Sequence, residues 1–306
     1  MKETIEYYYF VTVNDLKINN NSYYFLYNND LYYFVYYSRT ENEFSDILLC
    51  ISELKNKGIS VNEILLNKER SYFTKIEDLN YVLIKINNKD EKYNIIDMLN
   101  YNKKLKLLAN KSELYRNDWG ILWSAKIDYL ENQISELVIS PIVKYSIDYY
   151  IGLAENAIYY VNLINLKYEI SDLDNIVLSR KRIYYPNYNL NYFNPLSFIF
   201  DLEVRDVAEY IKSVFYFGED AFLELETYLK LRKLTAYSYN MLFARLIYPS
   251  YYFDMYEDIV NKNRDSECLI KIIDMSVQYE SFIKKAYLEI SKYALLEKID
   301  WLKVVH

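Results

Sequence analysis

The stretch from Ser179 to Lys212, SRKRIYYPNYNLNYFNPLSFIFDLEVRDVAEYIK, decides how this chain folds. It predicts a turn, a hairpin rich in Tyr and Asn, and a short apolar strand that ends at Asp201. An amphipathic helix is expected next, because apolar residues then recur at three- and four-residue steps. Asp206 falls at the predicted start of that helix. The segment therefore places one carboxylate at the end of a buried strand and a second near a helix N-terminus.

The residues upstream predict a small β-rich lobe at positions 1–88. Strands are expected, in chain order, at residues 22–27, 31–37, 62–66, 71–76 and 81–86. The first two flank the turn residues Asn28 to Asp30, which favour a hairpin. One helix is expected between the second and third strands, and Gly58 is a suitable residue to end it.

The remaining residues, 89–306, predict a larger and mainly helical lobe with a β insertion near residues 176–201. The polar run 86–90 is the expected hinge between the lobes. Helices are expected at residues 93–108, 112–137, 146–164, 219–232 and 235–247, and in a long C-terminal segment. Antiparallel strands followed by helices indicate the α+β class.

Composition removes several classes of function. The net charge of −7 without a basic block argues against a nucleic-acid partner, and no apolar run is long enough to span a membrane. The N-terminus has no signal-peptide pattern, so synthesis in the cytoplasm is expected. The only histidine is His306 and the chain has four isolated glycines. Histidine-based acid–base chemistry and glycine-rich phosphate loops are therefore not expected.

The chain contains 38 tyrosines, and two explanations stay open. The accompanying abundance of Asn, Lys and Ile points to an AT-rich genome, so the excess could reflect codon usage. Alternatively, a Tyr-rich surface could be selected for contact with partners, because tyrosine offers a large amphipathic contact area.

Three stretches carry a resemblance to a known family: YYIGLAENAIYYV (149–161), DLEVRDVAEYIK (201–212) and MLFARLIYPSYYFDMYE (241–257). They resemble the YutH-like spore coat family. This family is a spore coat kinase-like branch of the aminoglycoside and choline phosphotransferases, within the protein-kinase-like superfamily. The resemblance covers the whole chain and implies a two-lobe kinase-like fold.

The resemblance also implies a catalytic loop of the form His-Gly-Asp-x-x-x-x-Asn, whose best placement here is 180–187. The histidine is then Arg180 and the catalytic base is Arg182, while the asparagine is kept as Asn187. A guanidinium stays protonated in proteins, so Arg182 cannot accept a proton. Because the segment is rich in asparagine, Asn187 could also match by chance.

Asp201 falls where active relatives hold a metal-binding aspartate. It could be a residual magnesium ligand, or a strand-end carboxylate that hydrogen-bonds to nearby backbone, which is the reading we favour. Asp206 maps to a structural aspartate and is expected to act as an N-cap or to interact with the helix dipole. Arg205 and Glu209 are expected to form an exposed pair at i,i+4.

The small lobe lacks the residues that hold nucleotide phosphates in active relatives. The strand at 31–37 contains no lysine, and Lys85 is expected to be exposed or to line the cleft. Glu43, at the start of the inserted helix, then has no lysine partner. Phosphoryl transfer depends on positioning and charge neutralisation, so these losses together remove most of the catalytic machinery.

Glu155 and Asn156 form a polar pair on a predicted helix face. We expect them to cap or cross-link helices inside the larger lobe, and contact with a ligand is the alternative.

The expected function is a non-catalytic structural or assembly protein of the spore coat, in a low-GC endospore-forming bacterium. By resemblance its partners are other coat proteins, with no metal or cofactor required, although residual Mg-ATP binding stays open. One alternative is an atypical small-molecule phosphotransferase that uses Asp201 and Asn187 as metal ligands. Another alternative is a nucleotide-binding regulator without turnover. A further alternative is an unrelated α+β protein, which would lack the two-lobe cleft.

Overall fold

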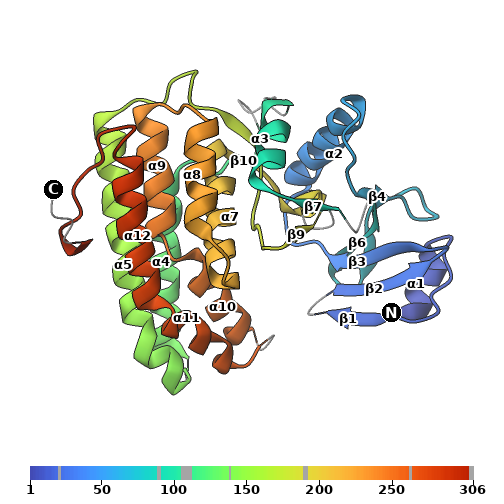
Figure 1. Ribbon diagram of the computed structural model, residues 1–306. Helices are drawn as coiled ribbons and strands as arrows, with labels where there is room; N and C mark the ends of the chain where they lie inside the picture. The colour runs from blue at the N-terminus through green and yellow to red at the C-terminus, as the bar shows by residue number, and fades with distance from the viewer. Residues whose placement is uncertain are drawn as a thin grey trace.

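The computed structural model describes residues 1–19, 22–87, 91–104, 112–137, 139–188, 192–261 and 264–302. It has a small β-rich lobe that contains the N-terminus and a larger helical lobe that contains the C-terminus (Figure 1). The predicted α+β class is confirmed, with an antiparallel sheet in the first lobe and mainly helices in the second.

The small lobe is built on one antiparallel sheet with the strand order β1-β2-β3-β6-β4, and β5 pairs with β6. The strands are β1 (Lys17–Asn19), β2 (Ser22–Tyr27), β3 (Asp30–Tyr36), β4 (Glu63–Leu65), β5 (Thr74–Ile76) and β6 (Leu79–Ile86). Asn28 and Asn29 both have positive φ, at 51° and 66°, which asparagine tolerates better than most residues. The tight β2–β3 hairpin therefore forms where the sequence predicts it.

Two helices cover the opposite faces of this sheet (Figure 1). α1 (Lys2–Tyr8) packs on one face, in a small core of its own. α2 (Glu41–Asn56) packs on the other face and joins the main core that continues into the helical lobe. Side chains alternate along β6, so Leu83 lies in the small core while Ile84 lies in the main core.

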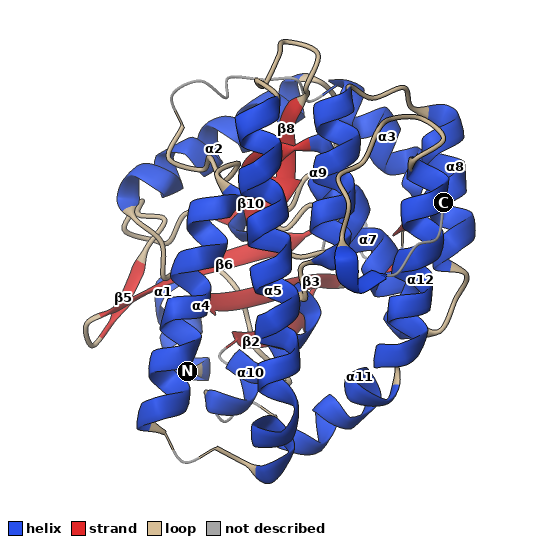
Figure 2. Ribbon diagram, turned by 90° about the vertical axis from the view of Figure 1, so that its left-hand side faces the viewer, coloured by secondary structure: helices blue, strands red, loops and turns tan. Residues whose placement is uncertain are grey.

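The larger lobe is a group of helices that surrounds α7 and α9. Its helices are α3 (Ile95–Lys104), α4 (Trp119–Glu136), α5 (Pro141–Lys167), α7 (Glu203–Phe217), α8 (Ala221–Leu231), α9 (Ala236–Ile247), α10 (Ser250–Val260), α11 (Ile270–Asp274) and α12 (Ser276–Ile290). Short 3₁₀ turns among the described residues include η2 (Pro195–Ser197), η3 (Ser266–Leu269) and η4 (Asp300–Leu302). Seen from the side of the helical lobe, α4 and α5 lie in front of the strands of the small lobe (Figure 2). α9 packs against both α5 and α7, so it lies inside the lobe.

The starts of α4 and α7 differ from the predicted ones in a way that bears on the site. α4 begins at Trp119 rather than near residue 112, because the Asp118 side chain caps it by accepting the Ile121 N–H. α7 begins at Glu203, and Asp206 lies within its first turn and does not cap it.

The β insertion connects the decisive stretch to the rest of the lobe. β8 (Ile176–Arg180) pairs antiparallel with β10 (Phe198–Leu202), and Asp201 lies opposite Val177. β7 (Lys92–Tyr93) pairs with β9 (Asn187–Tyr188). All five residues of β10 are buried and α7 follows it directly. The predicted strand and helix therefore form the centre of the lobe.

The predicted hinge at residues 86–90 includes residues 88–90, which lie outside the described ranges. β6 ends at Ile86 and α3 begins at Ile95. The division after residue 88 therefore stays a prediction. Within the described ranges, no helix has the length and apolar character that crossing a membrane requires.

Candidate functional site

The carboxylate of Asp201 is fully buried at the end of β10 and all its contacts are internal. The indole N–H of Trp119 donates to its two oxygens, at 2.9 and 3.1 Å. Oδ1 also accepts the backbone N–H of Leu202 at 2.8 Å, and Oδ2 lies 3.0 Å from Nε of Arg205. Burial raises the pKa of Asp201 to about 7, although Arg205 and Arg245 act in the opposite direction. Both oxygens therefore already have partners from the chain itself.

The expected exposed pair of Arg205 and Glu209 is wrong. Both side chains are about 5% exposed, and Arg205 makes ion pairs with Asp201 and Asp206 instead. Glu209 pairs with Lys212 and Arg245. The reason is the central position of α7: nearly every residue of its first three turns is buried, so the helix has no solvent face on which a surface pair could form.

Asp206 is a buried structural residue, and its partner is Arg180. Asp206 accepts the backbone N–H of Arg180 at 3.2 Å, and its carboxylate lies 3.5 Å from the Arg180 guanidinium. Burial raises the pKa of Asp206, while Arg180 and Arg205 oppose that change. The guanidinium of Arg180 also lies 3.4 Å from the centre of the Tyr192 ring and donates to the Tyr192 carbonyl. The residue at the histidine position of the predicted loop is therefore part of the packed interior.

Arg182, at the predicted position of the base, forms an ion pair with Asp254 on α10 through Nε and Nη2. Burial acts against its charge, yet Asp254 raises the pKa of Arg182 above its usual value. A group so firmly protonated cannot accept a proton. Asn187 lies in β9, and its side chain is outside the described part of the chain. Its predicted role as a metal ligand stays untested.

A small hollow of about 260 Å³ lies against Asp201, and we call it the basic pocket. Six cationic side chains line it: Arg116, Lys126, Lys181, Arg182, Arg205 and Arg245. Asp201 is the one acidic side chain among its described lining residues. Within the described ranges, no three His, Cys, Asp or Glu side chains are grouped as metal ligands. Magnesium needs several oxygen ligands, and a site dominated by guanidinium and ammonium groups does not fit it.

The carboxylate of Glu43 connects the two lobes. It lies 2.8 Å from Arg39 and 2.6 Å from Arg116, and Arg39 also donates to the carbonyl of Phe198 on β10. Glu43 completes a capping box with Thr40 at the start of α2. Burial acts against its charge, but its hydrogen bonds to Arg39 and Thr40 and the charges of both arginines lower the pKa of Glu43.

β3, the strand where the resemblance places the phosphate-binding lysine, reads DLYYFVY and contains no lysine. Lys85 lies on the neighbouring strand β6, is partly exposed and forms an ion pair with Asp30 at 2.6 Å. Glu43 is therefore paired with arginines from the two sides of the lobe contact.

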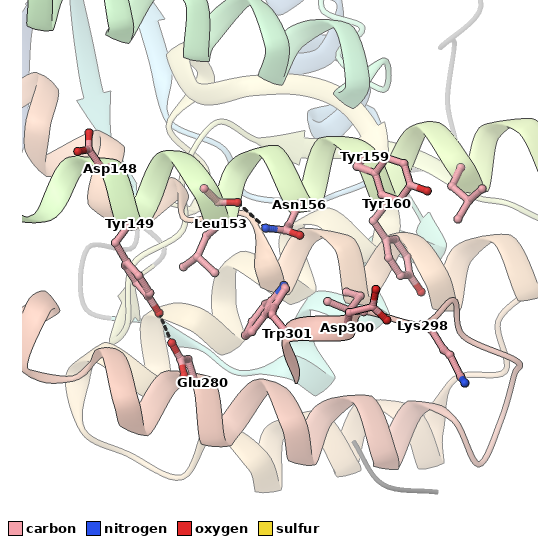
Figure 3. Close-up of a pocket in the computed structure, with 13 residues that line it drawn as sticks. Asp148, Tyr149, Leu153, Asn156, Tyr159, Tyr160, Glu280, Lys298, Asp300 and Trp301 are labelled. Carbon is pink, nitrogen blue, oxygen red and sulfur yellow. Dashed lines mark hydrogen bonds between the residues drawn. The ribbon is translucent and has the colours of Figure 1, made fainter. Parts of the chain in front are cut away.

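Glu155 and Asn156 do not join helices as expected. Both are exposed, and the amide of Asn156 donates to the Gly152 carbonyl within its own helix, α5. Asn156 lines a second hollow of about 670 Å³ between α5, α12 and the η4 turn (Figure 3). There Tyr149 donates to Glu280, and Trp301 lies close to Asn156 (Figure 3). Asn156 therefore lines this hollow and does not join α5 to another helix.

Sequence reasoning did not single out most residues of the basic pocket, including Trp119, Arg245 and Lys181. The hydrogen bond of Trp119 to Asp201 joins positions 82 residues apart. Arg245 lies in the helix predicted at residues 235–247, and no pattern there marks it as a site residue. Lys181 had a signal, since it is the middle residue of the basic run Arg180 to Arg182.

Comparison with known families gives a clear assignment. Residues 2–286 match the family described as "Spore coat putative kinase YutH". The chain belongs to this family. It is 28% identical over 187 residues to the endospore coat-associated protein YutH of Bacillus subtilis (strain 168), and the match spans 55% of each protein. The predicted family is thereby confirmed, while the match covers about half the length of this curated relative.

Similar solved structures show the fold of this chain. An aminoglycoside phosphotransferase from Alicyclobacillus acidocaldarius superposes with a TM-score of 0.61 at 9% identity, covering 95% of this chain and 97% of that one. An AMP-bound spectinomycin phosphotransferase gives a TM-score of 0.56 at 14% identity, with 90% and 93% covered. At such identities the likeness concerns the fold alone. The chain has the two-lobe protein-kinase-like fold of these phosphotransferases.

Proposed function

We propose that this chain is a kinase-fold protein without phosphotransfer activity and that it acts as a structural or assembly component of the endospore coat. The observation that carries the proposal is the state of Asp201, both of whose oxygens are bound by Trp119, Leu202 and Arg205. Membership in a spore coat family supports the location. The curated Bacillus subtilis relative is itself described as coat-associated.

Three positions that the resemblance links to catalysis are used in internal ion pairs. Asp201 is paired with Arg205, Arg182 with Asp254, and Glu43 with Arg39 and Arg116. Phosphoryl transfer by this fold needs metal ligands, a base or a group that positions the nucleophile, and a cation on the phosphates. Freeing Asp201 would break a buried ion pair, which costs several kcal/mol, whereas the pair of Arg182 and Asp254 is partly exposed.

Other coat proteins are the proposed partners, and the exposed tyrosines of α5 support a contact role. Tyr145 is 83% exposed and Tyr159 is 70% exposed, although many other tyrosines are buried. Exposed tyrosine gives a large contact area at low entropic cost, as binding surfaces require. The tyrosine excess therefore serves the core in part and the surface in part.

The test is an assay of ATP turnover with magnesium, on the full chain and on Asp201→Ala, with coat proteins and small hydroxylated acceptors offered as substrates. No product is expected from either protein. Phosphate transfer by the unmodified chain that Asp201→Ala abolishes would overturn the proposal.

Thermal shift with Mg-ATP gives a second test. A ligand at about 100 times its dissociation constant stabilises a protein by about 2.7 kcal/mol, which is easily measured. We expect no magnesium-dependent shift. Such a shift, lost in Asp201→Ala, would contradict the internal pairing of Asp201.

Fractionation of spores should place the protein in the coat extract, and its absence there would contradict the assembly role.

A further inference from the structure

The cations that line the basic pocket carry more positive charge than the carboxylates paired with them can balance. Three of those carboxylates are each shared between a pocket cation and a second, outer cation. Glu43 is shared with Arg39, Asp206 with Arg180, and Glu209 with Lys212. Counting these partners, nine cations and six carboxylates form one cluster in a chain whose net charge is −7.

Two of the lining cations offer donors that no described residue accepts. The ammonium of Lys181 makes no ion pair or hydrogen bond within the described ranges. Arg245 is 4% exposed and uses Nε to bind Glu209 at 2.7 Å. Its two terminal nitrogens make no hydrogen bond to the described residues. Both groups line the same hollow.

Aromatic rings hold the Arg245 guanidinium in place. Its Cζ atom lies 5.3 Å from the ring centre of Trp119, 5.4 Å from that of Trp123 and 5.8 Å from that of Tyr248. Trp123 and Tyr248 stack on each other at 4.1 Å. Such contacts with a cation are favourable and leave the outer edge of the guanidinium free to donate. The donors of Arg245 are therefore fixed before any ligand arrives.

Neighbouring cations of the basic pocket lower one another's pKa, as expected where no counter-ion neutralises them. Burial, together with Arg39, Arg116 and Arg182, lowers the pKa of Lys181 to about 8. Burial and the nearby Arg245 lower the pKa of Arg205 to about 10. Like charges held close together cost free energy, and a bound anion would recover it.

We propose that the basic pocket binds a phosphate group directly on Lys181 and Arg245, without a divalent cation. A phosphate fits better than a carboxylate because it carries up to two charges and three oxygens, which suits a guanidinium edge and an ammonium together. The inference rests on the internal pairing of Asp201 argued above, and it is independent of the coat role. The phosphate could be inorganic or an ester on a larger molecule, and both present the same group.

The experiment is a calorimetric titration of the full chain with sodium phosphate and with AMP, in the presence of a chelator and at constant ionic strength set by chloride. Saturable binding of at least one is expected. Stronger binding of inorganic phosphate would indicate a free ion as the ligand, and stronger binding of AMP would indicate an ester. Lys181→Gln should weaken binding about tenfold, because it removes a charged donor.

Two further variants make the test specific. Lys181→Arg keeps the charge and should retain most of the affinity. Lys75→Gln, on the exposed β5 strand of the other lobe, removes a lysine that lies outside the pocket and should bind like the unmodified chain. If neither phosphate nor AMP binds more tightly than chloride, or if Lys181→Gln binds as Lys75→Gln does, the proposal is wrong.

Magnesium separates this site from a conventional nucleotide site. Replacing the chelator with magnesium should leave the affinity for phosphate unchanged. An affinity that rises with magnesium and is lost in Asp201→Asn would show a metal site and overturn the proposal. Failure of anion binding would leave the turnover assay to decide the proposed function, so the two can fail separately.

Discussion

Nε of the Arg205 guanidinium lies 3.0 Å from the Asp201 carboxylate, so the chain neutralises its own charge at the end of β10. The same guanidinium lies 3.5 Å from Asp206 and donates to the carbonyl of Lys181 at 2.9 Å. One arginine therefore connects the strand end, the first turn of α7 and the loop after β8. In a kinase-like fold this is the place where a metal ion would connect similar elements.

Replacing this arginine should destabilise the protein strongly. Arg205→Met leaves two buried carboxylates, Asp201 and Asp206, with fewer partners, and we expect a loss of about 3–5 kcal/mol in the free energy of unfolding. Urea denaturation measures it. The double variant Asp201→Asn/Arg205→Met should lose at least about 1 kcal/mol less than the sum of the two single variants, because the groups are in contact. Simple additivity would show that the pair is not coupled.

The contact between the lobes should depend on Glu43. Glu43→Gln removes a buried carboxylate shared by Arg39 and Arg116, so we expect a loss of about 1.5–3 kcal/mol in urea denaturation. Hydrogen exchange in the first turn of α2 should also become faster. Glu63→Gln is the matched control, because its pair with Lys55 is partly exposed and should contribute less than about 1 kcal/mol. Equal losses for the two variants would contradict a special role for Glu43.

The fold could be predicted largely because its signals are local. β2, β3 and α2 follow from the alternation of aromatic residues, the turn at Asn28 and Asn29, and one apolar helix face. Short elements gave weaker signals. β1 has only three residues, and the pattern of residues 2–8 fits a helix and a strand equally well.

The site could be located but its contacts could not. The end of the apolar strand, together with the resemblance to the family, singles out Asp201. Its partner Trp119 is 82 positions away, and no local pattern reports such a contact. Arg205 was assigned to Glu209 by the rule for exposed helices, which fails where a helix is buried on nearly all sides. Arg205 pairs with Asp201 on β10, and Glu209 pairs with Arg245 on α9. Sequence periodicity does not show that these elements pack against α7.

Acid should remove part of the stability that Glu209 provides. The carboxylate lies 2.7 Å from Arg245, 2.8 Å from Lys212 and 2.9 Å from Ser250. Burial acts against its charge, but Lys212 and Arg245 hold the pKa of Glu209 well below its usual value of 4.5. A lowered folded-state pKa gives stability that is present above the unfolded value and lost as the pH falls through the folded one.

Glu209→Gln should therefore lower the free energy of unfolding by about 3–5 kcal/mol at pH 7, since it leaves buried cations without their partner. The difference between Glu209→Gln and the unmodified chain should shrink as the pH is lowered from 5 to 3. The comparison is made at each pH, so the ionisation of Asp201 affects both proteins and cancels. A difference that stays constant over this range would mean that Glu209 is not ionised in the folded protein.

The pH dependence of anion binding should identify Lys181 as a ligand group. Sulfate suits this measurement because its charge is constant between pH 6 and 9.5. The pKa of Lys181 is lowered to about 8 by burial and by Arg39, Arg116 and Arg182, with Glu43 opposing. Lys181 therefore loses its charge as the pH rises through that value, and the affinity for sulfate should fall about tenfold between pH 7 and 9.5.

The charges of Asp201 and Arg205 also affect how sulfate binding changes with pH. Burial raises the pKa of Asp201 to about 7, so its protonation below that value should strengthen sulfate binding further. Arg205, with a pKa lowered to about 10, keeps most of its charge over the range tested. In Lys181→Gln the affinity should be lower and should change less than about twofold between pH 7.5 and 9. If the unmodified chain binds sulfate equally at pH 7 and 9.5, Lys181 is not in contact with the anion, because a neutral amine cannot replace the charge that the bound dianion requires.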